Sequence, residues 1–228
     1  MPKKILVVLK TTEKYTNLNR ATGVWLGEAV HFVERVERVG FVVDYVSPTG
    51  GYTPIDPHSL AMAEPIDWEW YHNRKFMDRL GATLKPADVN PDDYAVIYFV
   101  GGHGVLWDFP DNAELQALSR KIYEKGGIVS SVCHGAVGLL NITLSNGTSL
   151  IKGKQVTGFS DEEERLAQLD QYVPFLTETE LKKRGVVYKK ADKPWEAFAV
   201  ADHRVITGQN PASGGAVADL VIQALTNR

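Results

Sequence analysis

Short runs of almost entirely apolar residues recur along this chain and alternate with stretches of helical periodicity. The clearest runs cover residues 5–9, 94–100 and 128–132. Runs this short and this apolar are typical of strands that are covered on both faces. The stretches that repeat apolar residues at helical spacing cover residues 22–39, 113–125 and 214–225. This alternation predicts an α/β fold, a doubly wound and mostly parallel sheet flanked by helices.

Length and charge narrow the class of protein. The chain has 228 residues, of which 44% are hydrophobic, and 25 basic residues stand against 28 acidic ones for a net charge of -3. This balance lacks the basic face that nucleic acid requires, and it gives no reason to expect binding to an anionic membrane. The apolar run at residues 5–9 ends at Lys10 and is too short for a signal peptide or a membrane helix. We therefore expect a soluble, cytoplasmic protein with one domain over residues 1–228.

One segment departs from the alternating pattern. Residues 47–72 contain many prolines and glycines and lead into an aromatic cluster around Trp68. A long loop in a compact α/β domain is usually functional, so we interpret this segment as an irregular insertion near the site. The alternative is a surface excursion with its own small core. The aromatic residues Tyr52, Trp107 and the cluster at 68–71 are either pocket residues or core residues.

The chain has a single cysteine, Cys133. It cannot form an internal disulfide or supply a cysteine-rich zinc site, so it is either a buried inert thiol or a reactive one. Cys133 follows an apolar strand, precedes a helical stretch and has small residues, Ser131 and Gly135, two positions away on either side. This arrangement is typical of a nucleophile elbow. A helix that begins at the sulfur is expected to favour the thiolate.

A second motif completes the predicted site. The glycine-rich segment from Gly101 to Gly104 directly follows the strand over residues 94–100. In a parallel sheet it lies at the same edge as Cys133, because ligands bind at the carboxyl ends of the strands. We expect the amides of Gly102 and His134 to form an oxyanion hole. His103 is either a structural residue of the turn or a substrate-binding residue.

These motifs together resemble the ThiJ/PfpI superfamily, which has the flavodoxin-like fold of class I glutamine amidotransferases. The closest likeness is to its branch of heat-inducible chaperones with glyoxalase III activity. The resemblance runs nearly end to end, and its segments are residues 23–28, 44–48, 56–60, 92–94, 101–104, 132–135, 153–154, 157–159 and 207–213.

The resemblance implies roles for individual residues. Cys133 would be the nucleophile and His134 the general acid/base beside it. Glu28 would lie against the sulfur, protonated, because burial and the neighbouring negative charge both raise the pKa of a carboxyl group. The third catalytic member would be Glu164, with Asp161 as the alternative. The other carboxylates of residues 161–164 are expected to be solvated.

The resemblance also implies a reaction. It is that of a glutathione-independent glyoxalase III (a lyase of the D-lactate dehydratase type), which converts methylglyoxal to lactate through a cysteine hemithioacetal in the stress response. The implied partner is a small 2-oxoaldehyde, the implied assembly is a homodimer, and neither a metal nor another cofactor is required. A metal site built from His58, Glu69, His72 or His103 lacks the spacing of a zinc signature.

Three alternatives stay open at this stage. A holdase chaperone or a redox sensor would use a low-pKa, exposed thiolate that oxidises readily. A cysteine hydrolase, such as a peptidase or deglycase, would use the same Cys133–His134 pair. A glutaminase is disfavoured, because the late His-x-Glu pair of that class is absent: His203 is followed by Arg204 and Val205.

Overall fold

The computed structural model describes residues 4–227. Its centre is a six-stranded sheet in the order β2-β1-β3-β4-β8-β7, in which all neighbours are parallel except β7 and β8. These strands are β1 (Lys4–Val8), β2 (Val43–Val46), β3 (Tyr94–Phe99), β4 (Ile128–Val132), β7 (Ala199–Asp202) and β8 (Val205–Gly208), and a separate parallel pair is formed by β5 (Gln155–Val156) and β6 (Val187–Tyr188). The predicted doubly wound, mostly parallel sheet is confirmed.

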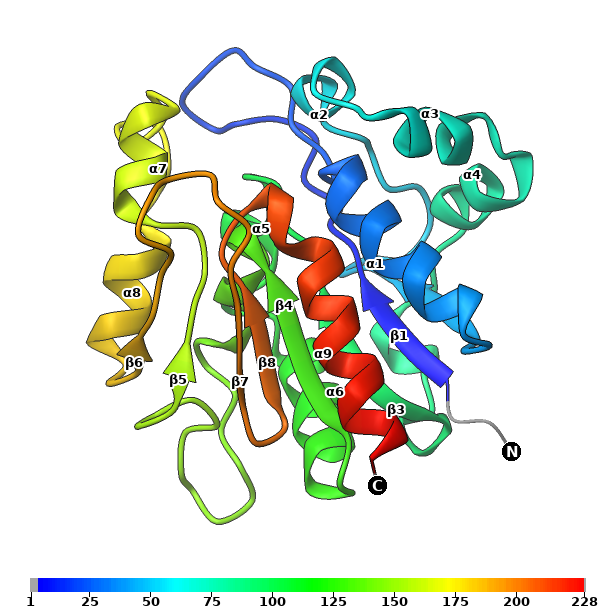
Figure 1. Ribbon diagram of the computed structural model, residues 1–228, viewed down its shortest axis with the longest axis vertical. Coiled ribbons are helices and arrows are strands. Elements are labelled where there is room, and N and C mark those ends of the chain that lie inside the picture. The colour runs from blue at the N-terminus through cyan, green and yellow to red at the C-terminus, as the bar shows by residue number, and fades with distance from the viewer. Residues whose placement is uncertain (1–3, 228) are drawn as a thin grey trace.

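Helices cover both faces of this sheet (Figure 1). They are α1 (Leu26–Arg38), α2 (Pro57–Ala61), α3 (Pro65–His72), α4 (Arg74–Gly81), α5 (Val105–Asp108), α6 (Ala113–Glu124), α7 (Asp161–Leu166), α8 (Thr177–Lys183) and α9 (Gly214–Thr226), with the 3-10 helices η1 (Pro86–Asp88), η2 (Pro91–Asp93), η3 (Cys133–Leu139) and η4 (Pro211–Ser213). Helices α1 and α9 pack together on one face, whereas α5 and α6 lie on the other. Each face buries its own apolar cluster against the strands.

One expectation about local structure needs correction. The segment 47–72 is not irregular throughout, because it contains α2 and α3. Its prolines Pro57 and Pro65 occupy the first position of these helices, where the missing N–H costs nothing and the fixed φ favours the helix. The helical stretch predicted at Cys133 is present as the 3-10 helix η3.

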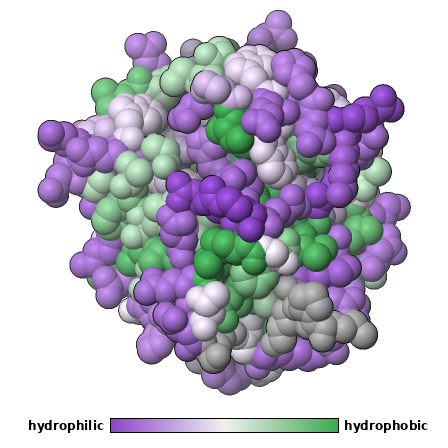
Figure 2. Space-filling model, turned by 45° about the vertical axis from the view of Figure 1, so that its right-hand side comes forward, coloured by the Kyte–Doolittle hydropathy of each residue, from purple (hydrophilic) through white to green (hydrophobic). Residues whose placement is uncertain are grey.

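The surface seen in Figure 2 is largely hydrophilic, and its apolar residues gather in small patches separated by polar ones. Within residues 4–227, no helix combines the length and the apolar character that crossing a membrane would require.

Three neighbouring strands bring the predicted site together. Strands β1, β3 and β4 are parallel, so their carboxyl ends meet at one edge of the sheet. Lys10 follows β1, the Gly101–Gly104 loop follows β3, and Cys133 follows β4. The elbow packs directly on the end of β3: a Cβ atom at Gly135 would lie 2.3 Å from the backbone oxygen of Phe99.

This contact yields a stability prediction. Gly135→Ala forces the elbow away from the end of β3, because the clash involves rigid backbone atoms, and we expect a loss of about 1–3 kcal/mol or more. Gly81→Ala is the matched control, since a Cβ atom at Gly81 meets nothing within 4 Å. Urea unfolding of both variants measures the difference. Equal stabilities would show that the elbow tolerates the added methyl group.

Candidate active site

Cys133 lies at the apex of a sharp turn between β4 and η3. Its backbone adopts φ +57°, a left-handed conformation that is rare for a residue with a side chain. Such strain persists only where the surrounding structure enforces it, and it is frequent at active sites. The side chain is 2% exposed, so the thiol reaches the outside only through the cavity described below. The predicted nucleophile elbow is therefore present in the backbone geometry.

His134 connects the thiol to a carboxylate. Its Nδ1 lies 3.3 Å from the Sγ of Cys133, and its Nε2 lies 2.6 Å from Oε2 of Glu164. The other carboxylate oxygen of Glu164 lies 2.7 Å from Nε2 of His103. All four side chains are buried, and Phe159 packs on the His134 ring. The structure thus joins Cys133, His134, Glu164 and His103 in one hydrogen-bonded array.

The carboxylate fixes the tautomers of both histidines. Burial alone would raise the pKa of Glu164, but the charge of His134 and the hydrogen bonds from both imidazoles hold that pKa well below its usual range. Burial and the neighbouring His134 lower the pKa of His103 to about 4. An ionised carboxylate can only accept hydrogen bonds, so each Nε2 carries the hydrogen. With Nε2 carrying a hydrogen, Nδ1 of His134 is the nitrogen placed to accept the thiol proton, as a base requires.

Glu28, from the first turn of α1, lies on the opposite side of the sulfur. Its Oε2 accepts a 2.8 Å hydrogen bond from the amide of Gly101. Its Oε1 is buried without a nitrogen or oxygen partner among the described residues, which leaves it to the Cys133 thiol. Burial raises the pKa of Glu28 to about 8, against the lowering effect of the hydrogen bonds with Cys133 and Gly101. This agrees with the expectation of a protonated carboxyl group.

The charge state of Cys133 differs from the sequence-based expectation. Burial, the charge of Glu28 and the hydrogen bond with Glu28 raise the pKa of the thiol well above its usual range, and the His134 amide only partly opposes this. The expectation of a thiolate favoured by a helix N-terminus is therefore wrong for the free protein. The desolvation of a buried sulfur outweighs the effect of the short 3-10 helix η3.

The acidic segment 161–164 also differs from expectation. Glu163 is fully buried rather than solvated, where it accepts hydrogen bonds from the Ser160 hydroxyl and amide, the Trp195 amide and the Asn210 side chain. Asp161, the alternative orienting residue, instead accepts hydrogen bonds from Thr179 at the start of α8. The residue that contacts His134 is Glu164.

A cavity of about 630 Å³ opens onto the thiol. Gly102, His103, Cys133 and His134 form its floor, and apolar side chains, among them Trp25, Met62, Phe159, Leu169 and Trp195, form much of its walls. Gly102 has φ +103°, and among the described residues no backbone partner takes its amide. Of the predicted pocket aromatics, Tyr52 is 67% exposed, and neither it nor Trp107 nor the 68–71 cluster lines this cavity.

One group of side chains among residues 4–227 could hold a metal ion. The donor atoms of His103, His134 and Glu164 lie within 4.8 Å of one another. In the described geometry, however, the two imidazole Nε2 atoms point at the carboxylate and are paired with it. A metal ion would have to replace both hydrogen bonds. The earlier candidates His58, Glu69 and His72 do not join this group.

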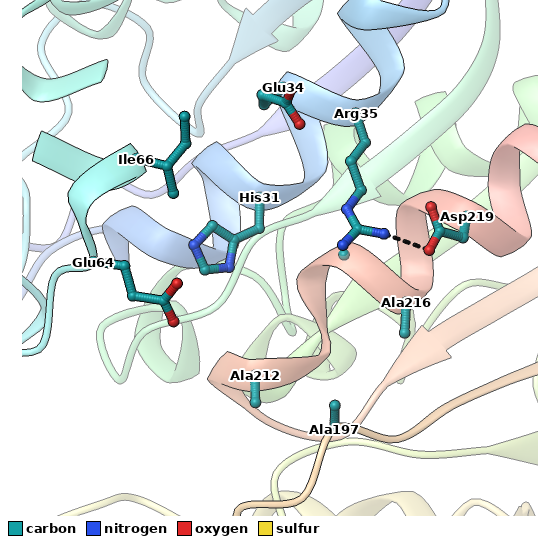
Figure 3. Close-up of a pocket in the computed structure, with 10 residues that line it drawn as sticks. His31, Glu34, Arg35, Glu64, Ile66, Ala197, Ala212, Ala216 and Asp219 are labelled. Atoms are coloured by element: carbon teal, nitrogen blue, oxygen red, sulfur yellow. Dashed lines mark hydrogen bonds and ion pairs between the residues drawn. The ribbon is translucent and has the colours of Figure 1, made fainter. Parts of the chain in front are cut away.

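A second cavity of about 410 Å³ lies alongside and shares His31 and Glu64 with the first. Figure 3 shows Arg35 of α1 extending toward Asp219 of α9, with which it forms an ion pair. His31 lies 3.1 Å from the buried carboxylate of Asp67, and its pKa is raised chiefly by that contact. The cationic groups of this cavity are therefore already neutralised within the protein.

Comparison with known proteins agrees with this geometry. The family model described as DJ-1/PfpI family matches residues 20–224. The chain belongs to the DJ-1/PfpI family. The resemblance to ThiJ/PfpI proteins seen in the sequence is thereby confirmed.

Several DJ-1/PfpI proteins are similar to this chain over their full length. Glutathione-independent glyoxalase HSP31 of Saccharomyces cerevisiae is 35% identical, and the match covers 99% of both chains. The crystal structure of glyoxalase III from Candida albicans superposes with a TM-score of 0.89 at 33% identity, covering 97% of both chains. The structure of Rapid Encystment Protein 24 KDa from Francisella tularensis gives a TM-score of 0.94 at 35% identity, covering 98% of this chain and 99% of that one.

Sequence reasoning missed two members of this DJ-1/PfpI site. It placed His103 near the substrate, whereas the structure also makes it the second partner of Glu164. It took Lys10 only as the end of an apolar run, whereas Lys10 is completely buried behind the glycine-rich loop. A lysine that directly continues a buried strand, with no turn residue between, was the available signal.

The raised pKa of Glu28 predicts how stability depends on pH. The folded protein keeps this proton up to about pH 8, whereas the unfolded chain releases it above the ordinary value of 4.5. Folding therefore takes up a proton in this window, and the contribution of Glu28 to stability falls by about 1.4 kcal/mol for each pH unit between these limits. Glu28→Gln has no titrating group at this position, so its stability lacks this fall with pH. Its side-chain oxygen can still accept the hydrogen bond from the Gly101 amide. Between pH 5 and 8, urea unfolding should show the free energy of unfolding of Glu28→Gln rising relative to that of the natural protein. A difference between the two free energies that stays constant with pH would contradict a protonated Glu28.

Proposed function

We propose that this protein is a glutathione-independent glyoxalase, which converts methylglyoxal and related 2-oxoaldehydes to 2-hydroxy acids. The observation that carries the proposal is the hydrogen-bonded array Cys133–His134–Glu164 at the floor of a cavity of about 630 Å³. The full-length relatives named as glutathione-independent glyoxalases support the same activity. Both supports come from independent features, the geometry of the site and the similarity of the whole chain.

The proposed reaction starts with a proton transfer. His134 Nδ1 takes the thiol proton of Cys133 as the sulfur adds to the aldehyde carbon, which gives a hemithioacetal. The ionised Glu164 stabilises the imidazolium that forms, so the raised pKa of the free thiol is not an obstacle. The amides of Gly102 and His134 stabilise the oxyanion of the adduct.

The remaining steps release the product and restore the free thiol of Cys133. His134 first gives the thiol proton to the oxygen of the adduct, which returns the imidazole to its basic form. It then removes the proton from the former aldehyde carbon and returns it to the neighbouring carbon by way of an enediol, which converts the hemithioacetal to a thioester. Protonated Glu28, beside the sulfur, keeps a second negative charge away from the adduct. Water then hydrolyses the thioester to the 2-hydroxy acid and restores the thiol. Atoms balance with water as the only other reactant.

The first test of this proposal is direct. Purified protein should consume methylglyoxal and form lactate in the absence of glutathione and in the presence of a chelator. Cys133→Ser and Cys133→Ala should reduce turnover by at least about 10³-fold, because both remove the nucleophile. Disappearance of methylglyoxal and appearance of lactate are measured together. Activity that survives these substitutions would rule out the cysteine mechanism.

A second test separates the two acidic candidates. Glu164→Gln replaces an acceptor with a group that also donates, which disturbs the tautomer of His134, and we expect a loss of roughly 10²–10⁴-fold in kcat. Asp161→Asn is the matched control on the same helix and should stay within a few-fold of the natural rate, since Asp161 contacts Thr179. Steady-state kinetics of both variants measure the contrast. The reverse ranking would assign the orienting role to Asp161.

The structure disfavours one of the alternative functions. A redox sensor of the expected kind requires an exposed thiolate, whereas Cys133 is buried and its pKa is raised. Homodimerisation stays a prediction of the family resemblance, which light scattering of the purified protein measures. A cytoplasmic location stays a prediction from the short apolar run at residues 5–9, which imaging of a tagged protein measures.

A further inference from the structure

Lys10 is the one lysine or arginine that is buried among residues 4–227, and the mechanism above does not use it. It follows β1 and lies behind the glycine-rich loop. A Cβ atom at Gly102 would lie 3.3 Å from its Nζ, and one at Gly104 only 2.5 Å. On the other side of the same loop, a Cβ atom at Gly101 would lie 3.0 Å from the Cβ of Cys133. Lys10 and the thiol are thus separated by the backbone of this loop.

A buried ammonium is costly unless several partners hold it. Lys10 donates a 2.9 Å hydrogen bond to the Thr22 hydroxyl, which in turn donates to Asp56 at 2.9 Å. The second oxygen of Asp56 accepts from the amide of His58 and thereby begins α2, which borders the cavity. Asp108 accepts from the amides of Thr11 and Thr12, the two residues after Lys10. Two carboxylates and a hydroxyl group therefore lie around this cation or fix the backbone beside it.

The location next to the site suggests what the cation does. The groups that face Lys10 electrostatically are Asp56, Asp108, Glu28 and Cys133, and its own charge acts on His103. Except for Lys10 and the histidines, the buried ionisable side chains around the thiol are acidic. A negative charge that develops on the sulfur or on the adduct oxygen would lie among these acidic groups, in a poorly solvated position where electrostatic interactions are strong.

We propose that Lys10 is a positioning residue of this site, whose positive charge acts through the Gly101–Gly104 loop to stabilise negative charge at Cys133. It does not touch the substrate. It lies behind the loop that carries the Gly102 amide, and it supplies a cation for the negative charge that develops on the sulfur. Burial lowers the pKa of Lys10 to about 7, opposed mainly by Asp56 and Asp108, so the charge is present below neutral pH and lost above it.

The single cysteine makes this proposal measurable without any substrate. Alkylation by iodoacetamide reports only on Cys133, because the chain has no other cysteine. Lys10→Met removes the charge and the hydrogen bond, whereas Lys10→Gln removes the charge and keeps a donor for Thr22. At pH 6.5 we expect both variants to be alkylated about 10-fold more slowly than the natural protein. The difference should shrink toward none by pH 8.5, where Lys10 has lost its own proton.

Lys4→Met is the matched control, because Lys4 lies at the other end of β1 in an exposed ion pair with Asp44. It should follow the natural profile at every pH. A constant deficit across the pH range in both Lys10 variants would show that the residue only supports the loop, and unchanged rates at pH 6.5 would show no coupling; either result overturns the proposal. If Lys10→Met does not fold, Lys10→Gln alone decides. Because alkylation needs no glyoxalase turnover, failure here is distinguishable from failure of the proposed function.

Discussion

The site depends on how closely the backbone at the end of β3 approaches the elbow after β4. Gly135 lies against Phe99, and Gly101 lies between Glu28 and Cys133, where any side chain would overlap one of them. These contacts hold the two loops close together. They also fix the strained backbone of Cys133, since a conformation that costs of order 1–3 kcal/mol persists only when its surroundings dictate it. The array of Cys133, His134 and Glu164 starts at this turn, and α7 supplies its carboxylate.

The same dense packing explains the electrostatics. Burial raises the pKa of both Glu28 and Cys133, so the sulfur and the carboxyl group beside it keep their protons in the free protein. Glu164 escapes this effect because two imidazoles donate to it. The site thus contains one carboxyl held neutral and one held charged, separated by the thiol and His134. Different environments assign different roles to chemically equal groups.

Sequence patterns predicted the parts of this arrangement that are local. Apolar runs located the strands within one or two residues, and the residues around Cys133 indicated the elbow. The prolines at 57 and 65 were misread because a proline can end one helix or begin another, and only the capping partners Asp56 and Glu64 distinguish the two. The partners that compensate the burial of Glu163 and Lys10 could not be predicted, for a different reason. Their burial is compensated by partners as distant in sequence as Asn210 and Asp56, and no local pattern reveals such pairs.

The raised pKa of the Cys133 thiol affects both its sensitivity to oxidation and its reaction with a carbonyl substrate. A cysteine that rests as a thiolate is open to oxidation whenever it is idle. A buried thiol with a neutral Glu28 on one side and a basic Nδ1 of His134 on the other rests in its protonated form. It becomes a nucleophile only when an electrophile occupies the cavity, because the thiol proton moves to His134 as the sulfur adds to the carbonyl carbon. The burial that lowers the reactivity of the free site therefore confines that reactivity to the moment when a carbonyl is bound.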